Sequence, residues 1–343
     1  MSVDTKKNYF GPRDDEDAEE YWTILLEAEE LGDAEEWDKA CEAQERAVKY
    51  AEEHYGDDLS AKSGLAYLYR QVSRHKDAEA LDRYILSVRQ QILGDDHEDT
   101  VASLNNLAID LKAQGEYDQS LELDKKALEI MLRIKGEDSQ TTQTSMHNLA
   151  NSYFNNKDYQ AALDLHQRAL DLRTKTLGPD HFQTIMTMDL LGRDYGALDK
   201  LQEAVALQEK AVEAARTHLG PSNQTTIKCS LNLASTYGRL NQANAEETPG
   251  GTWESKGIKL LEGIVEMQRQ GPGEEHSDTI AAMNNLSVAY FHAGRLEDAV
   301  PLMQKSVNWN MKKLGPNHPQ TQAASGNLDY VCEKLGMTRA SIF

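Results

Sequence analysis

A histidine next to an acidic or amide residue recurs along the sequence, at His97, His181, His276 and His318. Such pairs could bind a metal ion or exchange a proton. Each histidine, however, belongs to a different copy of one repeated turn. Helical units pack roughly 10 Å apart, which is too far for two copies to share a metal ion. We therefore expect these histidines to be structural parts of a turn, and we expect no metal site and no cofactor.

The densest set of polar side chains in the repeats comprises Asp110, His147, Asp189, Arg193 and Asp194. If the fold brought them together in a closed pocket, they could perform acid–base chemistry. A further pair, Asp164 and His166, is expected on the solvated face of a helix. The chain carries no sequence motif of a phosphate-binding loop, a nucleophile elbow or a zinc protease. We therefore expect no catalytic residues, with an enzyme built on the polar set as an alternative.

These residues lie in a phrase that returns along the chain. "SLNNLAIDL" begins at Ser103, "SMHNLANSY" at Ser145, and "MNNLSVAY" at Met283. The leucine at the centre of the phrase recurs every 42 residues, with one interval of 53, at Leu107, Leu149, Leu191, Leu233, Leu286 and Leu328. A period of 20 to 50 residues is typical of a solenoid built from stacked units.

Each unit has the pattern of a helix hairpin. Leu104, Leu107, Ala108 and Leu111 fall on one face of a helix, and a second amphipathic run follows a glycine-containing break. A closing turn such as "LGPDHFQT" then ends the second helix, because its glycine suits the left-handed position after a helix and its proline prevents continuation. We expect four early helices near 16–31, 35–55, 59–73 and 76–93. In total the pattern predicts an all-α chain of seven hairpins and one terminal helix, which ends near Leu335.

The expected domain organisation is simple. Residues 1–15 are predicted to be a disordered acidic tail, and residues 16–343 a single solenoid whose first hairpin, 16–57, is divergent. An insertion of 11 residues lengthens the sixth unit and predicts a loop at 241–257, with Pro249, Gly250 and Gly251. The same segment contains Trp253, which either packs back on the solenoid or forms part of a contact site.

Composition restricts the partners. The net charge of −21 argues against nucleic acid and anionic membranes as partners. Up to Asp58 there are 20 acidic and 6 basic side chains, which suit either a solubilising end or an electrostatic docking site. The three cysteines lack CxxC spacing, which favours buried packing residues in a reducing compartment. No secretory signal and no apolar run of roughly 20 residues is present, so a cytoplasmic location is expected.

The unit "T-x-x-S-L-N-N-L-A … G-x-Y-x-x-A … L-G-x-D-H" resembles the 42-residue tetratricopeptide repeat (TPR) of the kinesin light chain type. The resemblance covers residues 59–343 and, weakly, the first hairpin. It implies a right-handed α-α superhelix that binds other proteins. Kinesin light chains carry a long heptad coiled coil before their repeats, whereas residues 1–58 show no sustained heptads. The resemblance therefore implies a stand-alone adaptor rather than a motor subunit.

An asparagine precedes the central leucine in most units, at Asn106, Asn148, Asn232, Asn285 and Asn327. We call these five residues the asparagine ladder. A residue next to a core leucine is turned about 100° from it, so the ladder can face a concave groove. An amide can pair with both polar groups of an extended peptide backbone, and the resemblance implies a peptide groove at this position. Alternatively, the asparagines connect one helix to the next.

Side chains near the ladder would then set specificity. The candidates are Ser103, Asp110, Ser145, His147, Arg193 and Asp194. Because acidic residues outnumber basic ones here, a neutral or basic ligand is expected rather than an acidic one. Three functions remain open at this point. They are a non-catalytic scaffold that binds a peptide or protein segment, a structural or oligomeric assembly factor, and an enzyme in the groove.

Overall fold

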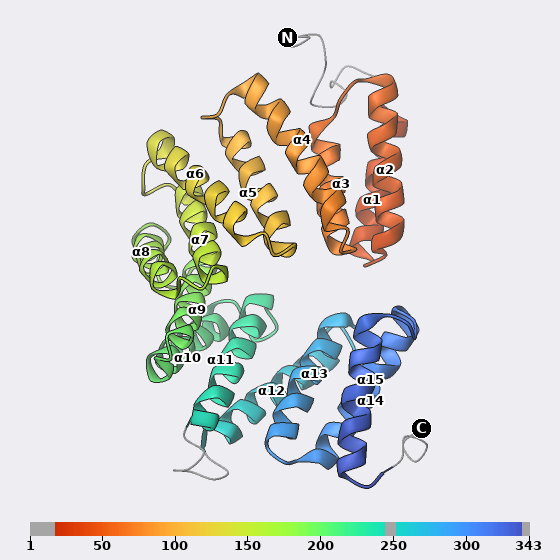
Figure 1. Cartoon of the computed structure of the whole chain (residues 1–343), viewed down its shortest axis with the longest axis vertical. Coiled ribbons are helices and arrows are strands. Elements are labelled where there is room, and N and C mark those ends of the chain that lie inside the picture. The colour runs from red at the N-terminus through yellow and green to blue at the C-terminus, as the bar shows by residue number, and fades with distance from the viewer. Residues whose placement is uncertain (1–17, 244–251, 338–343) are drawn as a thin grey trace. The chain divides into compact units, whose positions relative to one another are not determined.

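The computed structural model describes residues 18–243 and 252–337, and over these residues the chain is helical without a strand. The chain divides into two compact units, residues 1–165 and 166–343, and the division falls within α8 (Tyr159–Leu177). The predicted tail, residues 1–15, lies outside the described residues. Figure 1 shows the helices in chain order from red to blue.

The first unit contains three complete hairpins and the first helix of a fourth. Its helices are α1 (Glu19–Asp33), α2 (Trp37–His54), α3 (Leu59–Gln71), α4 (His75–Leu93), α5 (Glu98–Ala113), α6 (Tyr117–Lys135) and α7 (Gln140–Asn155). Each of these helices packs against the next one in the chain, and the first helices α5 and α7 of neighbouring hairpins also touch.

The second unit repeats this arrangement. Its helices after α8 are α9 (Phe182–Ala197), α10 (Leu201–His218), α11 (Gln224–Ala243), α12 (Thr252–Gln270), α13 (Ser277–His292), α14 (Leu296–Lys313) and α15 (Pro319–Lys334). Consecutive helices from α9 to α15 pack on one another, and α9, α11 and α13 touch in turn. The predicted pattern of seven hairpins and a terminal helix is therefore confirmed over the described residues.

The predicted loop at 241–257 is shorter than expected. Helix α11 continues to Ala243 and α12 begins at Thr252, so the helices occupy both ends of that range. Trp253 consequently belongs to the first turn of α12 rather than to a loop. Pro249, Gly250 and Gly251 lie outside the described residues.

The recurring histidine is a helix cap, as its place in a turn predicts. Nδ1 of His97 accepts a hydrogen bond from the backbone N–H of Asp99 at 3.1 Å. The same bond recurs from Gln183 to His181 at 3.3 Å and from Asp278 to His276 at 3.2 Å. A cap of this kind satisfies one of the backbone donors that the first turn of a helix leaves unpaired.

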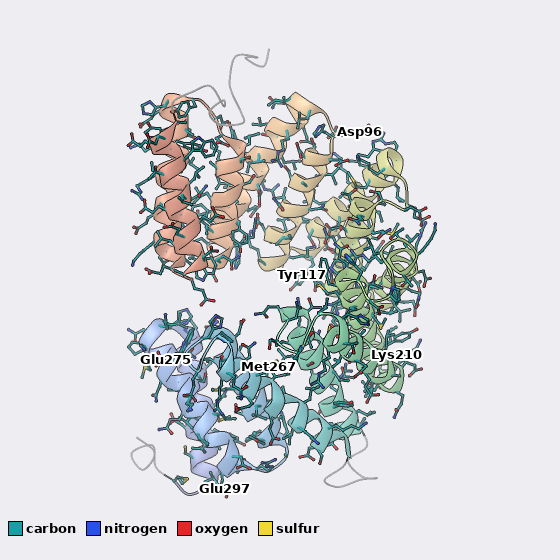
Figure 2. All side chains as sticks on the ribbon, turned by 180° about the vertical axis from the view of Figure 1, so that it is seen from behind. Asp96, Tyr117, Lys210, Met267, Glu275 and Glu297 are labelled. Atoms are coloured by element: carbon teal, nitrogen blue, oxygen red, sulfur yellow. The ribbon has the colours of Figure 1, made fainter. Side chains whose placement is uncertain are left out.

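The threonine at the start of α5, α9, α11 and α13 closes the same turn. Thr100 Oγ1 donates to the carbonyl of Gly94 at 2.8 Å, and Thr184 makes the equivalent bond to Gly178 at 2.8 Å. Both glycines have positive φ, 85° and 91°, as predicted for the residue after a helix. In the turn before α5, the carboxylate of Asp96 also pairs with Arg133 of α6, and Figure 2 labels Asp96 in this turn.

Small residues allow the helices of a hairpin to approach closely. Ala108 and Ala150 are fully buried, and the three cysteines are buried as free thiols, as predicted. At Gly192, which replaces the alanine in α9, a Cβ atom would lie 2.6 Å from Gln208 Cγ and 3.3 Å from the carbonyl of Ala204. The glycine is therefore required by the longer Gln208 side chain that packs against it. None of the helices in residues 18–243 and 252–337 meets the length and hydropathy of a bilayer-spanning segment.

Candidate functional site

The asparagine ladder lies on the solvent-facing side of the first helices, next to the buried core leucines. Asn106 and Asn148 in the first unit and Asn232 in the second are partly buried. Asn285 and Asn327, also in the second unit, are exposed. The following leucines are buried, for example Leu107 and Leu328. We call the side of the first helices that carries the ladder the first-helix face.

One ladder residue connects two helices. Asn232 Nδ2 of α11 donates to Asp189 Oδ2 of α9 at 2.6 Å. Asp189 is buried, and this burial raises the pKa of its carboxyl to about 7. Within the described residues, the amides of Asn106, Asn148, Asn285 and Asn327 make no side-chain hydrogen bond. The alternative role of the ladder therefore applies to Asn232, and the other four amides keep their hydrogen-bonding capacity.

An apolar side chain follows the ladder position after three residues at both ends of the repeat array. In this position the exposed large apolar residues are Tyr67, Ile109, Val288 and Tyr330. Residues three apart on a helix are neighbours on its surface, so each of these side chains stands beside its ladder position. The same position in α7, α9 and α11 holds the polar residues Asn151, Arg193 and Ser235. The sequence analysis missed this pattern, although the 42-residue register was sufficient to find it.

A groove of about 560 Å³ lies on the first-helix face of the second unit, between α13 and α15. Asn284 and Val288 line it from α13, while Ala324 and Asn327 line it from α15. Part of its wall comes from α14, where Trp309 is fixed by a hydrogen bond from Nε1 to the carbonyl of Glu275 at 2.7 Å. The groove thus combines amide groups with an apolar wall, and its volume falls within the range of ligand sites.

Four residues predicted to set specificity are buried between helices instead. Ser103 Oγ accepts a hydrogen bond from Arg89 Nη1 at 2.9 Å, and Ser145 Oγ donates to the carbonyl of Thr141 at 3.2 Å. Asp110 and Asp194 are likewise fully buried with partners inside the chain. Their positions face the preceding hairpin, so these four side chains do not contribute to the first-helix face.

His147 and Arg193 are only partly buried. His147 Nε2 lies 3.1 Å from Asn151 Nδ2 on the same helix. Arg193 Nη2 lies 3.4 Å from Asp194 Oδ1, and burial lowers the pKa of its guanidinium. These two residues remain candidates for contact with a ligand.

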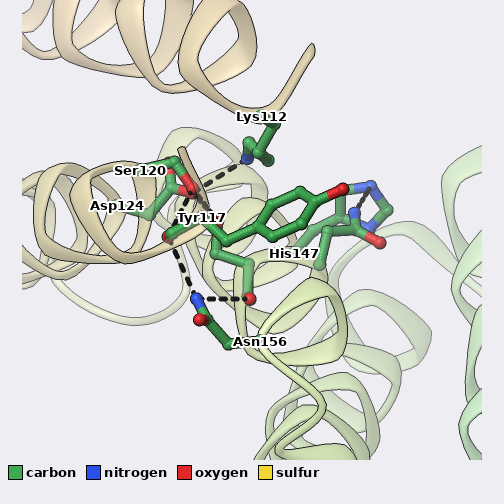
Figure 3. A network of polar contacts seen from close by, with 8 residues as sticks. Lys112, Tyr117, Ser120, Asp124, His147 and Asn156 are labelled. Atoms are coloured by element: carbon green, nitrogen blue, oxygen red, sulfur yellow. Dashed lines mark hydrogen bonds and ion pairs between the residues drawn. The ribbon is translucent and has the colours of Figure 1, made fainter. Parts of the chain in front are cut away.

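The buried aspartates belong to a set of polar pairs that link consecutive hairpins. Asp124 of α6 accepts a hydrogen bond from Ser152 of α7 at 2.5 Å, and Lys112 Nζ lies 2.9 Å from the same carboxylate. Figure 3 shows Lys112 reaching Asp124 from α5. Nearby, Asn156 Nδ2 donates to the carbonyl of Tyr117 at 3.0 Å. This network closes the junction between two hairpins of the first unit.

An equivalent pair joins α4 to α5. Arg70 Nη1 lies 2.7 Å from Asp82 and 2.9 Å from Asp110. Burial, together with the neighbouring Asp82 carboxyl, raises the pKa of Asp110 to about 7. Arg70 and Lys112 are 42 residues apart, as are Asp82 and Asp124, so the two networks occupy the same place in successive hairpins.

In the second unit the equivalent pair is His166 and Asp194, with 2.5 Å between Nδ1 and Oδ2. Both side chains are fully buried. The expectation that His166 lies on a solvated face is therefore wrong. The reason is that its neighbour comes from the next hairpin, which the local pattern of the helix does not reveal. We call the three couples Asp82–Asp110, Asp124–Ser152 and His166–Asp194 the inter-hairpin polar pairs.

The aspartates of the polar set proposed for an enzyme have partners between helices. Asp110 is paired with Arg70, Asp194 with His166, and Asp189 with Asn232. Each of these contacts joins two helices of the same unit. In the part of the chain that the structure describes, no group of three His, Cys, Asp or Glu side chains could hold a metal ion.

Comparison with solved structures places the fold. A protein of Podosopora anserina with nearly identical TPR-like repeats of the kinesin light chain type is 25% identical, with a TM-score of 0.51. The match covers 62% of this chain and 96% of that chain. The apo form of RapI is 16% identical, with a TM-score of 0.57 and coverage of 85% and 98%. The apo quorum sensor NprR from B. thuringiensis is 16% identical, with a TM-score of 0.51 and coverage of 91% and 87%.

No curated protein matches the sequence. Sequence profiles of the tetratricopeptide repeat match residues 57–133, 141–217 and 279–320. These ranges contain three of the five ladder residues, Asn106, Asn148 and Asn285, and all three inter-hairpin polar pairs. Together with the all-α solenoid fold of the solved neighbours, they show that the chain belongs to the tetratricopeptide repeat family, whose members are in general non-catalytic scaffolds for protein–protein interaction.

Proposed function

We propose that this chain binds an extended segment of a partner protein along the first-helix face, and that the ladder amides hold the main chain of that segment. The observation that carries the proposal is the repeated pairing of an exposed amide with an exposed apolar side chain one turn further along the helix. Asn285 stands beside Val288, and Asn327 beside Tyr330. Asn327 and Val288 also line the groove between α13 and α15.

This pairing matches the chemistry of an extended chain. Such a segment presents unpaired N–H and C=O groups along its length, and these need partners when they leave water. An amide offers donors and an acceptor to those groups. The adjacent apolar side chain can cover a side chain of the same segment. The amides would bind the main chain of the segment at several places, and the apolar residues would contact its apolar side chains between those places.

The charge of the chain indicates the kind of partner. With 57 acidic and 36 basic residues, the protein repels acidic segments and favours a neutral or basic one. The quorum sensor NprR shares the fold, which supports a scaffold that receives another molecule. We place this binding in the cytoplasm, because three free cysteines fit a reducing compartment.

Replacement of Asn285 and Asn327 by alanine tests the proposal. Random twelve-residue peptides displayed on phage are selected on the full chain, and the best binder is titrated by fluorescence anisotropy. Loss of two hydrogen bonds of about 1 kcal/mol each should weaken binding roughly 30-fold. Asn308→Ala, at an exposed position of α14 outside the first-helix face, is the matched control.

The same affinity for the double variant and the wild-type chain would refute the role of the ladder. Size-exclusion chromatography of the unliganded protein tests the alternative of an assembly factor. A concentration-dependent oligomer that dissociates in the double variant would show that the first-helix face binds another copy of the chain instead.

A further inference from the structure

A second cavity, of about 300 Å³, lies at the other end of the chain between α1 and α3. Its apolar lining includes Leu25 and Ala28 of α1, Trp37 of α2, and Leu68 of α3. At this volume, the lower limit for a ligand site, it suits one bulky side chain rather than a small molecule. Tyr67, half exposed beside it, extends the apolar wall into solvent.

The cavity exists because the ladder position in α3 is a glycine. Gly64 stands where five of the six later units carry an asparagine (the sixth has Leu190), and it lines the cavity. A Cβ atom at this residue would lie 3.0 Å from Gln44 Nε2. Any longer side chain at position 64 would project into the space between α1 and α3. The second hairpin thus has a cavity at the position where most later units have an amide.

The rim of this cavity is acidic. Glu29 and Asp33 line it from α1, a helix that contains no basic residue. Within the described residues neither carboxylate takes part in an ion pair. Lys39 and Arg46 of α2 are occupied elsewhere, by Glu36 and Glu27 respectively. A cation that approaches the rim therefore meets two carboxylates without a competing positive charge.

An apolar strip leads along α1 to this rim. Trp22 and Leu26 are 55% and 54% exposed, and spacings of four and three residues place them on the same side of α1 as Glu29. Exposed aromatic and aliphatic side chains bordered by charge are typical of a contact with another protein.

We infer that this cavity anchors one apolar side chain, phenylalanine, leucine or methionine, of a partner segment that carries lysine or arginine next to it. The apolar side chain enters the space above Gly64, and the adjacent cation pairs with Glu29 and Asp33. The inference rests on the proposed function, because the cavity lies on the first-helix face. Beyond that function, the inference specifies the type of one anchoring side chain of the partner and the positive charge of the residues next to it.

Three fluorescein-labelled nine-residue peptides test this inference against the full chain by anisotropy. Their central triplets are Lys-Phe-Lys, Lys-Ala-Lys and Glu-Phe-Glu, in identical Gly-Ser flanks. The Lys-Phe-Lys peptide should bind at least tenfold more tightly than either of the others. Its advantage over Glu-Phe-Glu should shrink with added salt, because exposed charges are screened. Equal binding of the three peptides would overturn the inference.

Gly64→Asn is the decisive variant, since it restores the side chain found in other units and fills the cavity. It should abolish the preference for phenylalanine over alanine. Gly263→Asn is the matched control, at a helical glycine with no atom near the added Cβ. If Gly64→Asn fails to fold, Glu29→Gln with Asp33→Asn should still weaken Lys-Phe-Lys binding at least threefold. An unchanged affinity in a folded variant of either type refutes the anchor.

Two further arms separate the possible occupants. The segment Lys6-Lys7-Asn8-Tyr9-Phe10 of this chain has the same chemistry as the proposed ligand. A Tyr9→Ser, Phe10→Ser variant that binds Lys-Phe-Lys more tightly would show that the chain occupies its own cavity, which overturns assignment to a partner. If the Asn285→Ala, Asn327→Ala variant no longer binds the phage-selected peptides, while the wild-type chain shows no preference for Lys-Phe-Lys, the anchor alone is refuted. The converse result would refute the ladder alone.

Discussion

His166 and Asp194 form a buried contact of 2.5 Å between Nδ1 and Oδ2, and they are separated by 28 residues. The same separation joins Asp124 to Ser152 at 2.5 Å. Each pair connects the second helix of one hairpin to the first helix of the next. The next junction has the buried polar residues Gln208 and Thr236 at these positions. The last two junctions have apolar residues instead, Leu261 with Ala289 and Met303 with Val331. A polar pair and an apolar pair can therefore fill the same position between two consecutive hairpins.

Asp194→Ala should lower the free energy of unfolding by at least about 2 kcal/mol, because it leaves a buried imidazole without this partner. The double variant His166→Leu, Asp194→Ala copies the apolar junction at Leu261 and Ala289. It should recover most of the loss. Urea denaturation followed by circular dichroism measures both. A double variant that is less stable than Asp194→Ala would contradict this account of the junction.

The contribution of Asp189 to the stability of the fold should fall as pH rises from about 4 to about 7. The pKa of Asp189 is raised to about 7 in the fold, against roughly 3.9 in the unfolded chain. Between these values the folded state binds more protons, so it is favoured at the acidic end of the window and loses that advantage as pH increases.

Asp189→Asn isolates this contribution, because its amide resembles the neutral acid. The variant should show a flatter dependence of the urea midpoint on pH between 4.5 and 8. The wild-type chain should carry an additional slope of up to about 1.4 kcal/mol per pH unit. Parallel curves for the two proteins would mean that Asp189 is ionised throughout.

Thr184→Val should destabilise the chain by about 1 kcal/mol, since it removes the hydrogen bond to the carbonyl of Gly178. Thr321 provides a matched control at the equivalent position of α15. Its buried Oγ1 has no hydrogen-bond partner in residues 18–243 and 252–337, so Thr321→Val should be close to neutral. Thermal melting of the two variants compares them directly, and equal losses would refute the role assigned to the turn.

Alanine should have opposite effects at two helical glycines. Gly192→Ala places a Cβ atom 2.6 Å from Gln208 Cγ, and it should cost about 1–3 kcal/mol through overpacking. Gly263→Ala meets no atom within 4 Å, so it should stabilise by about 0.5–1 kcal/mol through helix propensity. Chemical denaturation gives both values. A neutral Gly192→Ala would show that Gln208 moves aside freely.

Most of the fold could be predicted from the sequence because its signals are local. The 42-residue period can be read directly from the sequence. The glycine after each second helix and the capping histidine each act within a single turn. The boundaries of the insertion were wrong because helical propensity extends to Ala243 and resumes at Thr252, across the apparent loop.

The candidate site was harder to predict because it depends on contacts between units. The orientation of Asn106 followed from its position beside Leu107, whereas the burial of Asp110 did not. Its neighbours Arg70 and Asp82 lie 40 and 28 residues earlier in the chain. Helical periodicity identifies the side of a helix that is buried, but it does not identify which polar residues the next hairpin covers.

The inter-hairpin polar pairs also determine which residues meet when the gene loses one repeat. Unequal recombination between similar copies would most readily remove one 42-residue unit, for example residues 140–181. The shortened protein would then align Asp124 with Asp194, two carboxylates that meet in the interior with Lys112 as the nearest cation. Asp82, Asp110 and Arg70 already have this arrangement, so a lineage that loses this copy obtains a junction of a kind that the chain already contains.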